Sequence, residues 1–357
     1  MKIVTVIGAR PQFVKLGPLA EALAGKATEL VVHTGQHYDT RMSKVFFDDM
    51  GLPEPAVNLG IGSGYHGAMT GDMLKAIEEV LLRESPQLMI VFGDTNSTLA
   101  GALAACKLHI PVAHVESGLR SFNRLMPEEI NRILTDHASD LLFCPTESAV
   151  EQLRQEGITS GVHCTGDVML DALLHYQPIA TARSNILKEL ELKPGNFNLV
   201  TIHRAENTDD EENLHSILTG LSNTDLPLVF PVHPRTRKIL NSNRFQQLTA
   251  SNKLLRIIEP VGFLDMISLE QSASRILTDS GGIQKEAYWL GKPCITLRNE
   301  TEWTETVTQG YNRLVGANLG QIVDALQNFF PNHQADSLYG DGKASEGIVR
   351  AILEFLS

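Results

Sequence analysis

Short apolar runs alternate with segments of helical periodicity along the first half of the chain. Each run is almost continuously apolar and ends in Gly, Asp, Glu, Ser or Thr, which is typical of parallel strands buried on both faces. The helical segments between the runs, the first of which ends near Leu23, indicate βαβ units and a parallel sheet. The pattern predicts strands over residues 2–8, 29–35, 87–94, 111–117, 140–146 and 163–167.

The same alternation restarts after residue 195. A polar stretch over 170–195, with a helical pattern and a KPGN turn, separates the two series. We therefore expect an α/β protein with one domain over 1–170 and a second over 171–344. Two such halves would place the carboxyl ends of two parallel sheets around one cleft, where open sheets bind ligands. The second series predicts strands over 196–203, 226–233, 254–261, 274–282 and 293–298.

Composition and net charge indicate which classes of protein and partner fit this sequence. The 357 residues include 43% hydrophobic and 20% charged residues, as in a soluble globular protein. The net charge of −12 argues against nucleic acid and anionic membranes as partners. No apolar run approaches the roughly 20 residues of a membrane helix, and residues 1–13 lack the pattern of a signal peptide. The four cysteines lack metal-ligand spacing, so we expect a cytoplasmic protein without a structural metal.

Polar residues at the ends of the predicted strands are the candidates for chemistry. In 279–287 (DSGGIQKEA) a strand ends, two glycines follow and a helix begins. Helix N-terminal amides attract phosphate, and glycines let the backbone approach it. Glu286 follows one turn later, where it can accept from ribose hydroxyls. This segment predicts a diphosphate site that needs no net positive charge.

Carboxylates are more numerous than binding alone requires. Asp94 and Glu116 end neighbouring strands, and Glu128 and Glu129 open a helix. Carboxylates in a partly dry cleft have raised pKa values and can move protons, although Glu128 and Glu129 equally suit a helix dipole. His203 ends a strand in the sequence TIHRAEN, which favours ligand contact over a purely structural role.

One glycine motif, GSGYHG at 62–67, matches the dinucleotide fingerprint G-x-G-x-x-G. The residues before it make a poor central strand. The next acid at a strand end, Asp94, lies further along the chain than the acidic residue of this fingerprint. We expect a glycine-rich loop here rather than a nicotinamide site.

Eight motifs together resemble the non-hydrolysing UDP-N-acetylglucosamine 2-epimerases of bacteria and archaea, a family that includes relatives acting on UDP-2,3-diacetamido-2,3-dideoxyglucuronate. They occur in the family's order along almost the whole chain. These are GARPQFVK (8–15), GDTNSTLAG (93–101), HVESGLR (114–120), PEEINR (127–132), TIHRAEN (201–207), PVHP (231–234), LTDSGGIQKEA (277–287) and YGDGKAS (339–345).

The resemblance implies a GT-B-like fold of two Rossmann-like domains whose parallel sheets face one cleft, with a C-terminal helix over 345–357 crossing back to the first domain. It also implies inversion of C2 of a UDP-2-acetamido sugar without a cofactor, through elimination and re-addition of UDP, in a homodimer. By motif, the catalytic residues are Asp94, Glu116, Glu128 and His203. The substrate-binding positions are Arg10, Lys15, Arg120, His233, Ser280, Gly281, Gly282, Glu286 and Arg298.

Because this chain departs from the family pattern, the identity of the sugar in its substrate is undecided. Where the family has T-R-P-E, this chain has Ala9-Arg10-Pro11-Gln12, and Trp303 replaces the arginine of T-E-R-P-E. Trp303 cannot replace a guanidinium charge. The stretch at 36–41 keeps two residues of the family's Q-H-R-x-x-L-D-Q motif, which predicts weak or absent activation by substrate.

Several alternatives remain at this point. The substrate is either UDP-GlcNAc or the diacetamido uronate, and which carboxylate is base or acid is undecided. A GT-B glycosyltransferase or a non-catalytic nucleotide-sugar sensor would share the fold and the nucleotide site.

Overall fold

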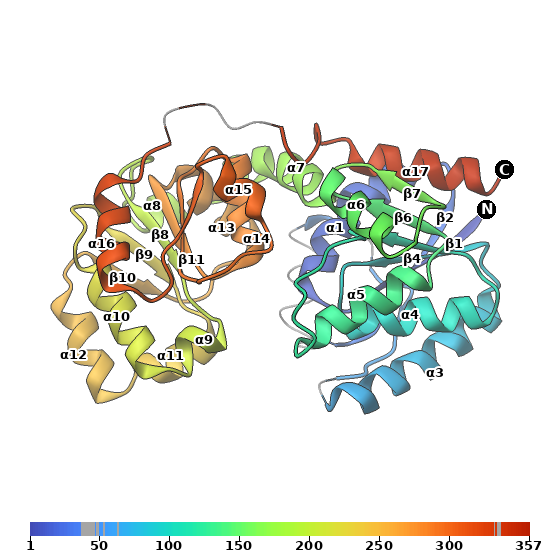
Figure 1. The fold of residues 1–357 in the computed structure, drawn as a ribbon, viewed down its shortest axis with the longest axis horizontal. Helices are drawn as coiled ribbons and strands as arrows, with labels where there is room; N and C mark the ends of the chain where they lie inside the picture. Colours follow the sequence, from blue (N-terminus) through green and yellow to red (C-terminus); the bar gives the residue numbers. More distant parts are fainter. Residues whose placement is uncertain (37–46, 48–49, 53, 63, 332, 334–336) are drawn as a thin grey trace. The chain divides into compact units, whose positions relative to one another are not determined.

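The computed structural model describes residues 1–36, 47, 50–52, 54–62, 64–331, 333 and 337–357. Two compact units make up the chain (Figure 1). Unit 1 contains Met1–His175 and Ser337–Ser357, and unit 2 contains Tyr176–Asp336. Each unit is built on one open, all-parallel sheet, which confirms the α/β fold with two Rossmann-like halves.

The sheet of unit 1 has seven strands in the order β3-β2-β1-β4-β5-β6-β7. Strand order reverses between β1 and β4, so the loops after these two strands form the switch point where such sheets bind ligands. The strands are β1 (Lys2–Ile7), β2 (Thr28–His33), β3 (Val57–Asn58), β4 (Leu88–Phe92), β5 (Val112–Val115), β6 (Leu141–Cys144) and β7 (Val162–Cys164).

Helices cover both faces of this sheet, as buried parallel strands require. Val4 and Val6 of β1 point to the face covered by α3 and α4, where they pack with Met73 and Ala100. The helices are α1 (Arg10–Leu23), α3 (His66–Glu84), α4 (Asn96–Lys107), α5 (Pro127–His137), α6 (Glu147–Gln155), α7 (Val168–Arg183, which continues into unit 2) and α17 (Ala344–Phe355).

The six-stranded sheet of unit 2 has the order β10-β9-β8-β11-β12-β13, with its reversal between β8 and β11. The loops after β8 and β11 therefore form the second switch point. The strands are β8 (Asn198–Thr201), β9 (Leu228–Pro231), β10 (Leu255–Ile258), β11 (Arg275–Thr278), β12 (Cys294–Thr296) and β13 (Asn312–Leu314).

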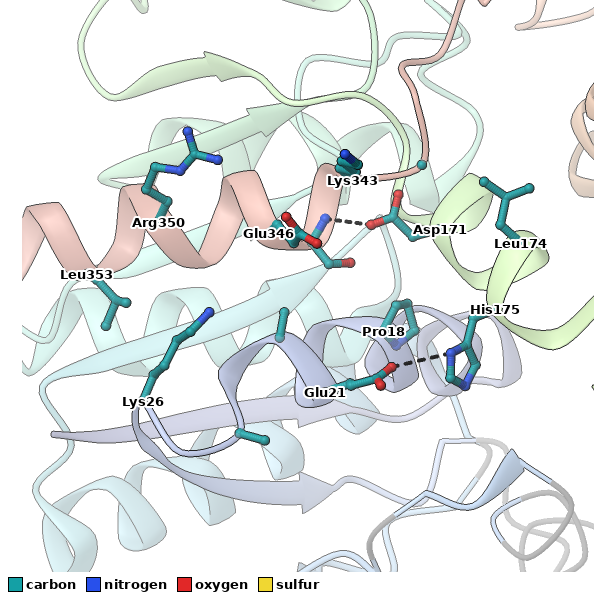
Figure 2. Close-up of a pocket in the computed structure, with 14 residues that line it drawn as sticks. Pro18, Glu21, Lys26, Asp171, Leu174, His175, Lys343, Glu346, Arg350 and Leu353 are labelled. Carbon is teal, nitrogen blue, oxygen red and sulfur yellow. Dashed lines mark hydrogen bonds and ion pairs between the residues drawn. The ribbon is translucent and has the colours of Figure 1, made fainter.

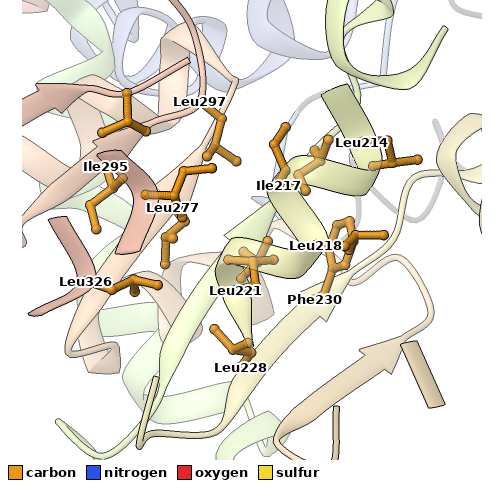
Figure 3. Packing of buried hydrophobic residues seen from close by; sticks show 14 of the residues in the cluster. Leu214, Ile217, Leu218, Leu221, Leu228, Phe230, Leu277, Ile295, Leu297 and Leu326 are labelled. Carbon is orange, nitrogen blue, oxygen red and sulfur yellow. The ribbon is translucent and has the colours of Figure 1, made fainter. Parts of the chain in front are cut away.

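An apolar layer fixes the helices of unit 2 to its sheet. Figure 3 shows Leu214 and Leu218 of α10 packing toward Phe230 of β9 and Leu277 of β11, with Leu326 of α16 in the same buried cluster. The helices are α8 (Ile186–Glu189), α9 (Ala205–Thr208), α10 (Glu211–Leu221), α11 (Pro234–Leu240), α12 (Asn243–Ser251), α13 (Phe263–Ser272), α14 (Gly281–Trp289), α15 (Thr304–Thr308) and α16 (Leu319–Asn328).

Two edge strands, β3 and β13, were not among the strands expected from the sequence. They contain two and three residues, too few for an apolar run to stand out. All the other strands coincide with expected ones. Among the described residues, no helix has both the length and the apolar character to cross a membrane.

Candidate functional site

Gln12 forms hydrogen bonds with both loops of the first switch point. Its Oε1 accepts from the backbone N–H groups of Gly8 and Ala9, at 2.7 and 3.0 Å. Its Nε2 donates to the carbonyl of Phe92 at 2.8 Å, and it also contacts the hydroxyls of Thr95 and Thr98. The side chain is buried, so these bonds hold the start of α1 against the end of β4.

Lys15 and Glu116 form a buried ion pair at this switch point. The side chain of Lys15 is 7% exposed and that of Glu116 is 15% exposed. Glu116 has φ 70°, a left-handed conformation that is strained for a residue with a Cβ atom. Two neighbouring amides, of Glu116 and Ser117, both donate to the carbonyl of Phe143 and hold this turn. Such strain is kept where the surrounding structure enforces it, often at functional sites.

Asp94 lies beside the same pair. Its Oδ2 is 2.5 Å from Nη2 of Arg132, and its side chain keeps 30% exposure. Burial raises the pKa of the Asp94 carboxyl, and the Arg132 guanidinium opposes this shift. The charges of Glu116 and Glu128 raise the pKa further, whereas Lys15 lowers it. Three predicted carboxylates, Asp94, Glu116 and Glu128, are therefore close enough to influence one titration.

The two glutamates that open α5 have different roles. Glu129 is buried, and its carboxylate accepts from the backbone amides of Ser121 and Phe122, both at 2.9 Å. Burial raises the pKa of Glu129, but these hydrogen bonds and that from Arg132 outweigh it and hold the pKa below its ordinary value. Glu129 therefore fixes the 121–122 turn, while Glu128 remains half-buried beside Asp94.

Arg120 is part of a buried network behind this cluster. Its guanidinium is 2.7 Å from carboxylate oxygens of both Asp136 and Glu156, and its side chain is 2% exposed. Asp136 also contacts Nδ1 of His114 at 2.7 Å, and Nε2 of that histidine faces the carbonyl of Gly93. These contacts give Arg120 a structural role, and its predicted substrate contact stays a prediction.

In unit 2, Asp279 organises the second switch point. Its carboxylate accepts from the backbone amides of His203 and Arg204 at 3.0 Å and from Nδ2 of Asn207 at 3.1 Å. Nδ1 of His203 lies 3.0 Å from the other carboxylate oxygen. Burial alone raises the pKa of Asp279, but these contacts outweigh it and the pKa lies below its ordinary value. Asp279 thus orients His203, whose side chain is 42% exposed.

His233 is a second exposed histidine near this loop. Its ring centroid lies 6.2 Å from that of His203. Burial, followed by the charges of His203 and Arg235, lowers the pKa of His233. The imidazole is therefore biased toward its neutral form, which offers both a hydrogen-bond donor and an acceptor.

The N-terminus of α14 is shaped for a close backbone approach. Ser280 is the N-cap residue, yet its side chain makes no cap hydrogen bond. A Cβ atom on Gly281 would lie 2.4 Å from Oε1 of Glu302, whereas one on Gly282 would have no heavy-atom neighbour nearer than 3.9 Å. Gly282 therefore opens onto free space beside the helix amides, and half-buried Glu286 follows one turn later.

Charged side chains surround this N-terminus. Arg298 is buried and contacts Oε2 of Glu302 at 2.9 Å, and Nη2 of Arg204 is 3.9 Å from Oε1. Burial raises the pKa of Glu302, but the charges of both arginines lower it below its ordinary value. Lys285 lies 4.0 Å above the ring of Trp303, a cation–π contact at the position where the family pattern has arginine.

The predicted site residues thus fall into two groups. In unit 1, Lys15, Asp94, Glu116 and Glu128 come together, and exposed Arg10 is the first residue of α1. In unit 2, the others follow β8, β9, β11 and β12, either in the loops or in the first turns of α14. They are His203, His233, Ser280, Gly281, Gly282, Glu286 and Arg298.

Sequence reasoning missed four residues that position these groups. Arg132 could have been predicted from the sequence, because it lies four residues after Glu128 on the same helix face. No signal along the chain identifies Gln12, Asp279 or Glu302 as positioning residues. Their partners lie either 72 to 98 residues away or only three or four residues away in the same loop.

Two predicted features include residues that the structure does not describe. Residues 37–41, on which the activation prediction rests, are outside the described residues. Gln36 is described, and its side-chain oxygen accepts from the amide and hydroxyl of Ser97. The GSGYHG segment follows the two-residue strand β3 and includes the first two residues of α3, and residue 63 within it is not described.

Comparison with known proteins gives matches along the chain. A family model described as UDP-N-acetylglucosamine 2-epimerase matches residues 21–353. A UDP-N-acetylglucosamine 2-epimerase homolog of Methanococcus maripaludis is 52% identical, with 99% of each chain covered. A UDP-2,3-diacetamido-2,3-dideoxy-D-glucuronate 2-epimerase of Pseudomonas aeruginosa is 48% identical, with 98% of each chain covered.

A solved structure shares the fold at similar identity. The crystal structure of Methanocaldococcus jannaschii UDP-GlcNAc 2-epimerase in complex with UDP-GlcNAc and UDP is 46% identical. The match has a TM-score of 0.89 and covers 99% of this chain and 100% of that one.

Proposed function

We propose, because the chain belongs to the UDP-N-acetylglucosamine 2-epimerase family, that it inverts C2 of UDP-GlcNAc to give UDP-ManNAc. In this reaction a base removes the C2 proton and the bond between C1 and the UDP oxygen breaks. The products are a 2-acetamidoglycal and UDP. UDP then adds back to C1 while a proton is delivered to C2 from the opposite face.

The carboxylates of unit 1 supply the proton transfers in this proposal. C2 inversion needs a donor and an acceptor, and Asp94, Glu116 and Glu128 lie together at the first switch point. The raised pKa of Asp94 suits a group that gains and loses a proton during turnover. Lys15 forms an ion pair with Glu116, and Arg132 forms one with Asp94.

The loops of unit 2 hold the leaving group. UDP departs with negative charge, which the backbone amides of Gly281 and Gly282 at the start of α14 would stabilise, with the Ser280 hydroxyl as a further contact. His203, oriented by Asp279, would donate to the diphosphate, and Arg10 would add a positive charge. Glu286 would accept from the ribose hydroxyls. We propose substrate contacts for Lys15, His233 and Arg298 as well.

One observation carries this proposal most directly: a carboxyl with a raised pKa, Asp94, lies beside two further carboxylates in a chain of this family. The test is incubation with UDP-GlcNAc in deuterated water without NAD. We expect deuterium at C2 of both sugars. Asp94→Asn should abolish the exchange, whereas Asp72→Asn, on the exposed face of α3, should leave it unchanged.

A second substrate has comparable support. The chain is 48% identical to the diacetamido-glucuronate epimerase and 46% identical to the UDP-N-acetylglucosamine 2-epimerase of Methanocaldococcus jannaschii. Trp303, stacked on Lys285, replaces a family arginine beside the diphosphate loop. The same exchange assay with UDP-2,3-diacetamido-2,3-dideoxyglucuronate compares kcat/KM for the two sugars. Exchange with neither sugar would reject the proposed reaction.

Two functions of other classes predict different results. A GT-B glycosyltransferase would release UDP only when an acceptor is present. A non-catalytic sensor would keep its function in Glu116→Gln, whereas an epimerase would lose turnover and retain substrate binding. We further propose a homodimer that works in the cytoplasm and supplies polysaccharide synthesis. All four cysteines are free, in keeping with a reducing compartment.

A further inference from the structure

Unit 1 contains a polar cavity that none of the proposed chemistry uses. It has a volume of about 780 Å³, within the range of small-molecule sites. Residues of the C-terminal half of α1 and the loop after it form one wall. One face of α17 forms the other, and α7 closes an end (Figure 2).

Some of the charged groups that line this cavity have partners and others do not. Lys26, Lys343 and Arg350 are exposed, and within the described chain none of the three has an ion-pair partner. Two of the carboxylates are already engaged. Glu21 contacts Nδ1 of His175 at 3.3 Å, and Asp171 accepts from the first amides of α17 at 3.1 and 2.7 Å.

The third carboxylate, Glu346, also lacks a partner among the described residues. Unpaired cations therefore outnumber the unpaired carboxylate by three to one, in a protein whose net charge is −12. Glu346 and Arg350 lie four residues apart on one face of α17, and Lys343 is the N-cap residue of this helix; all three belong to the cavity lining. Figure 2 shows Glu346 and Arg350 on α17 and Lys343 at its start, with Lys26 across from them on the α1 side and the Arg350 guanidinium directed away from that side.

Apolar surface lies beside the charges. Leu174 is 47% exposed at the α7 end, and Pro18 and Leu353 contribute to the walls. Guanidinium and ammonium groups bind phosphate through charge-assisted hydrogen bonds. A free carboxylate accepts from hydroxyl groups, and apolar side chains pack against the C–H face of a sugar ring. Together these groups match a ligand that carries both phosphate and hydroxyls.

We propose that this cavity binds a phosphorylated sugar. Lys26, Lys343 and Arg350 would hold the phosphate, and Glu346 would accept from the sugar hydroxyls. The site is separate from both switch points, because it lies at the carboxyl end of α1 rather than at its start. Its lining includes His175, the last residue of unit 1 before the chain enters unit 2.

Isothermal titration of the full chain tests the proposal. The protein is first saturated with UDP, and this step independently reports whether the nucleotide site exists. Glucose 6-phosphate, inorganic phosphate and glucose are then titrated separately. We expect glucose 6-phosphate to bind at least about tenfold more tightly than phosphate, and glucose alone to give no binding.

Variants locate the binding. Lys343→Ala and Arg350→Ala should each weaken the binding of glucose 6-phosphate about tenfold or more, as expected for loss of a charge-assisted hydrogen bond. The matched control is Lys107→Ala, an exposed and unpaired lysine in the last turn of α4, which should bind like the wild type. Among the described residues, no hydrogen bond or ion pair involves any of the three side chains, so the Tm should stay close to that of the wild type. Absence of binding, equal affinity for phosphate alone, or unchanged affinity in both cavity variants would overturn the proposal.

Discussion

The Oδ2 atom of Asp94 lies 2.5 Å from Nη2 of Arg132, and the other terminal nitrogen of that guanidinium contacts Glu129 at 3.0 Å. Arg132 thus bridges a carboxyl of raised pKa and one of lowered pKa. The two acids differ because Glu129 also accepts from two backbone amides, whereas desolvation dominates at Asp94.

Replacement of Arg132 should therefore change the pH dependence of kcat. Arg132 lowers the pKa of Asp94, so Arg132→Gln should raise that pKa further and shift one limb of the kcat profile to higher pH. If Asp94 is the base, the acidic limb moves; if Asp94 is the acid, the alkaline limb moves. The measurement is the rate of C2 exchange across pH.

Arg132→Lys is the control for this shift, because it keeps the positive charge. Its profile should stay close to that of the wild type even if its rate falls. Identical profiles for the wild type and Arg132→Gln would show that Asp94 does not limit turnover.

Asp279→Asn should destabilise unit 2 by about 2–3 kcal/mol at neutral pH, since it weakens hydrogen bonds to a buried charged acceptor. The sign of the pH dependence follows from the lowered pKa of Asp279. Its contribution is present above the unfolded pKa of about 3.9 and is lost as pH falls through the lower, folded pKa.

The free energy of unfolding, measured with urea between neutral and acid pH, checks this prediction. The wild type should lose more stability than the variant over the acid range. Parallel curves for the two proteins would contradict the assignment.

Gly282→Ala should impair binding without harming the fold. The added methyl group has open space in the protein, but it would occupy the approach to the amides of α14. We expect KM for the UDP-sugar to rise about tenfold, the cost of one lost charge-assisted contact, while the Tm stays unchanged. Gly71→Ala, in an open position on α3, is the control and should leave KM unaltered.

Gln12→Ala should cost about 2–4 kcal/mol of stability, because it leaves two buried backbone amides without an acceptor and removes three donor contacts. Exposed Gln155 makes one hydrogen bond with Glu151, so Gln155→Ala should change stability by no more than about 0.5 kcal/mol. Chemical denaturation of both variants measures the difference. Equal stabilities would show that the two loops of the first switch point hold together without Gln12.

The sequence predicts the parallel sheets well because strands buried on both faces must be apolar throughout. It also points to the glycine loop at 281–282, since a strand, two glycines and a helix are local features. The roles of individual side chains depend on distant partners. The sequence does not reveal, for example, that the guanidinium of Arg120 contacts Asp136 and Glu156, 16 and 36 residues later.

Trp303 is a second residue whose surroundings could not be predicted from the sequence. Its sequence position indicates only that a family arginine is missing. The structure places Lys285 over its ring, so a cation lies in this region from a different element. Local patterns thus predict where loops occur, while the charge at each point depends on which helices pack there.

Unit 1 is interrupted by unit 2 in the order of synthesis. Residues 1–175 emerge from the ribosome before unit 2, but α17, which buries Ile348, Val349 and Ile352 and packs against α1, is translated only after it. Until then, Asp171 has no helix amides to accept from, and apolar surface on unit 1 stays uncovered. The nascent first unit therefore remains exposed to chaperones or to aggregation throughout the translation of the second.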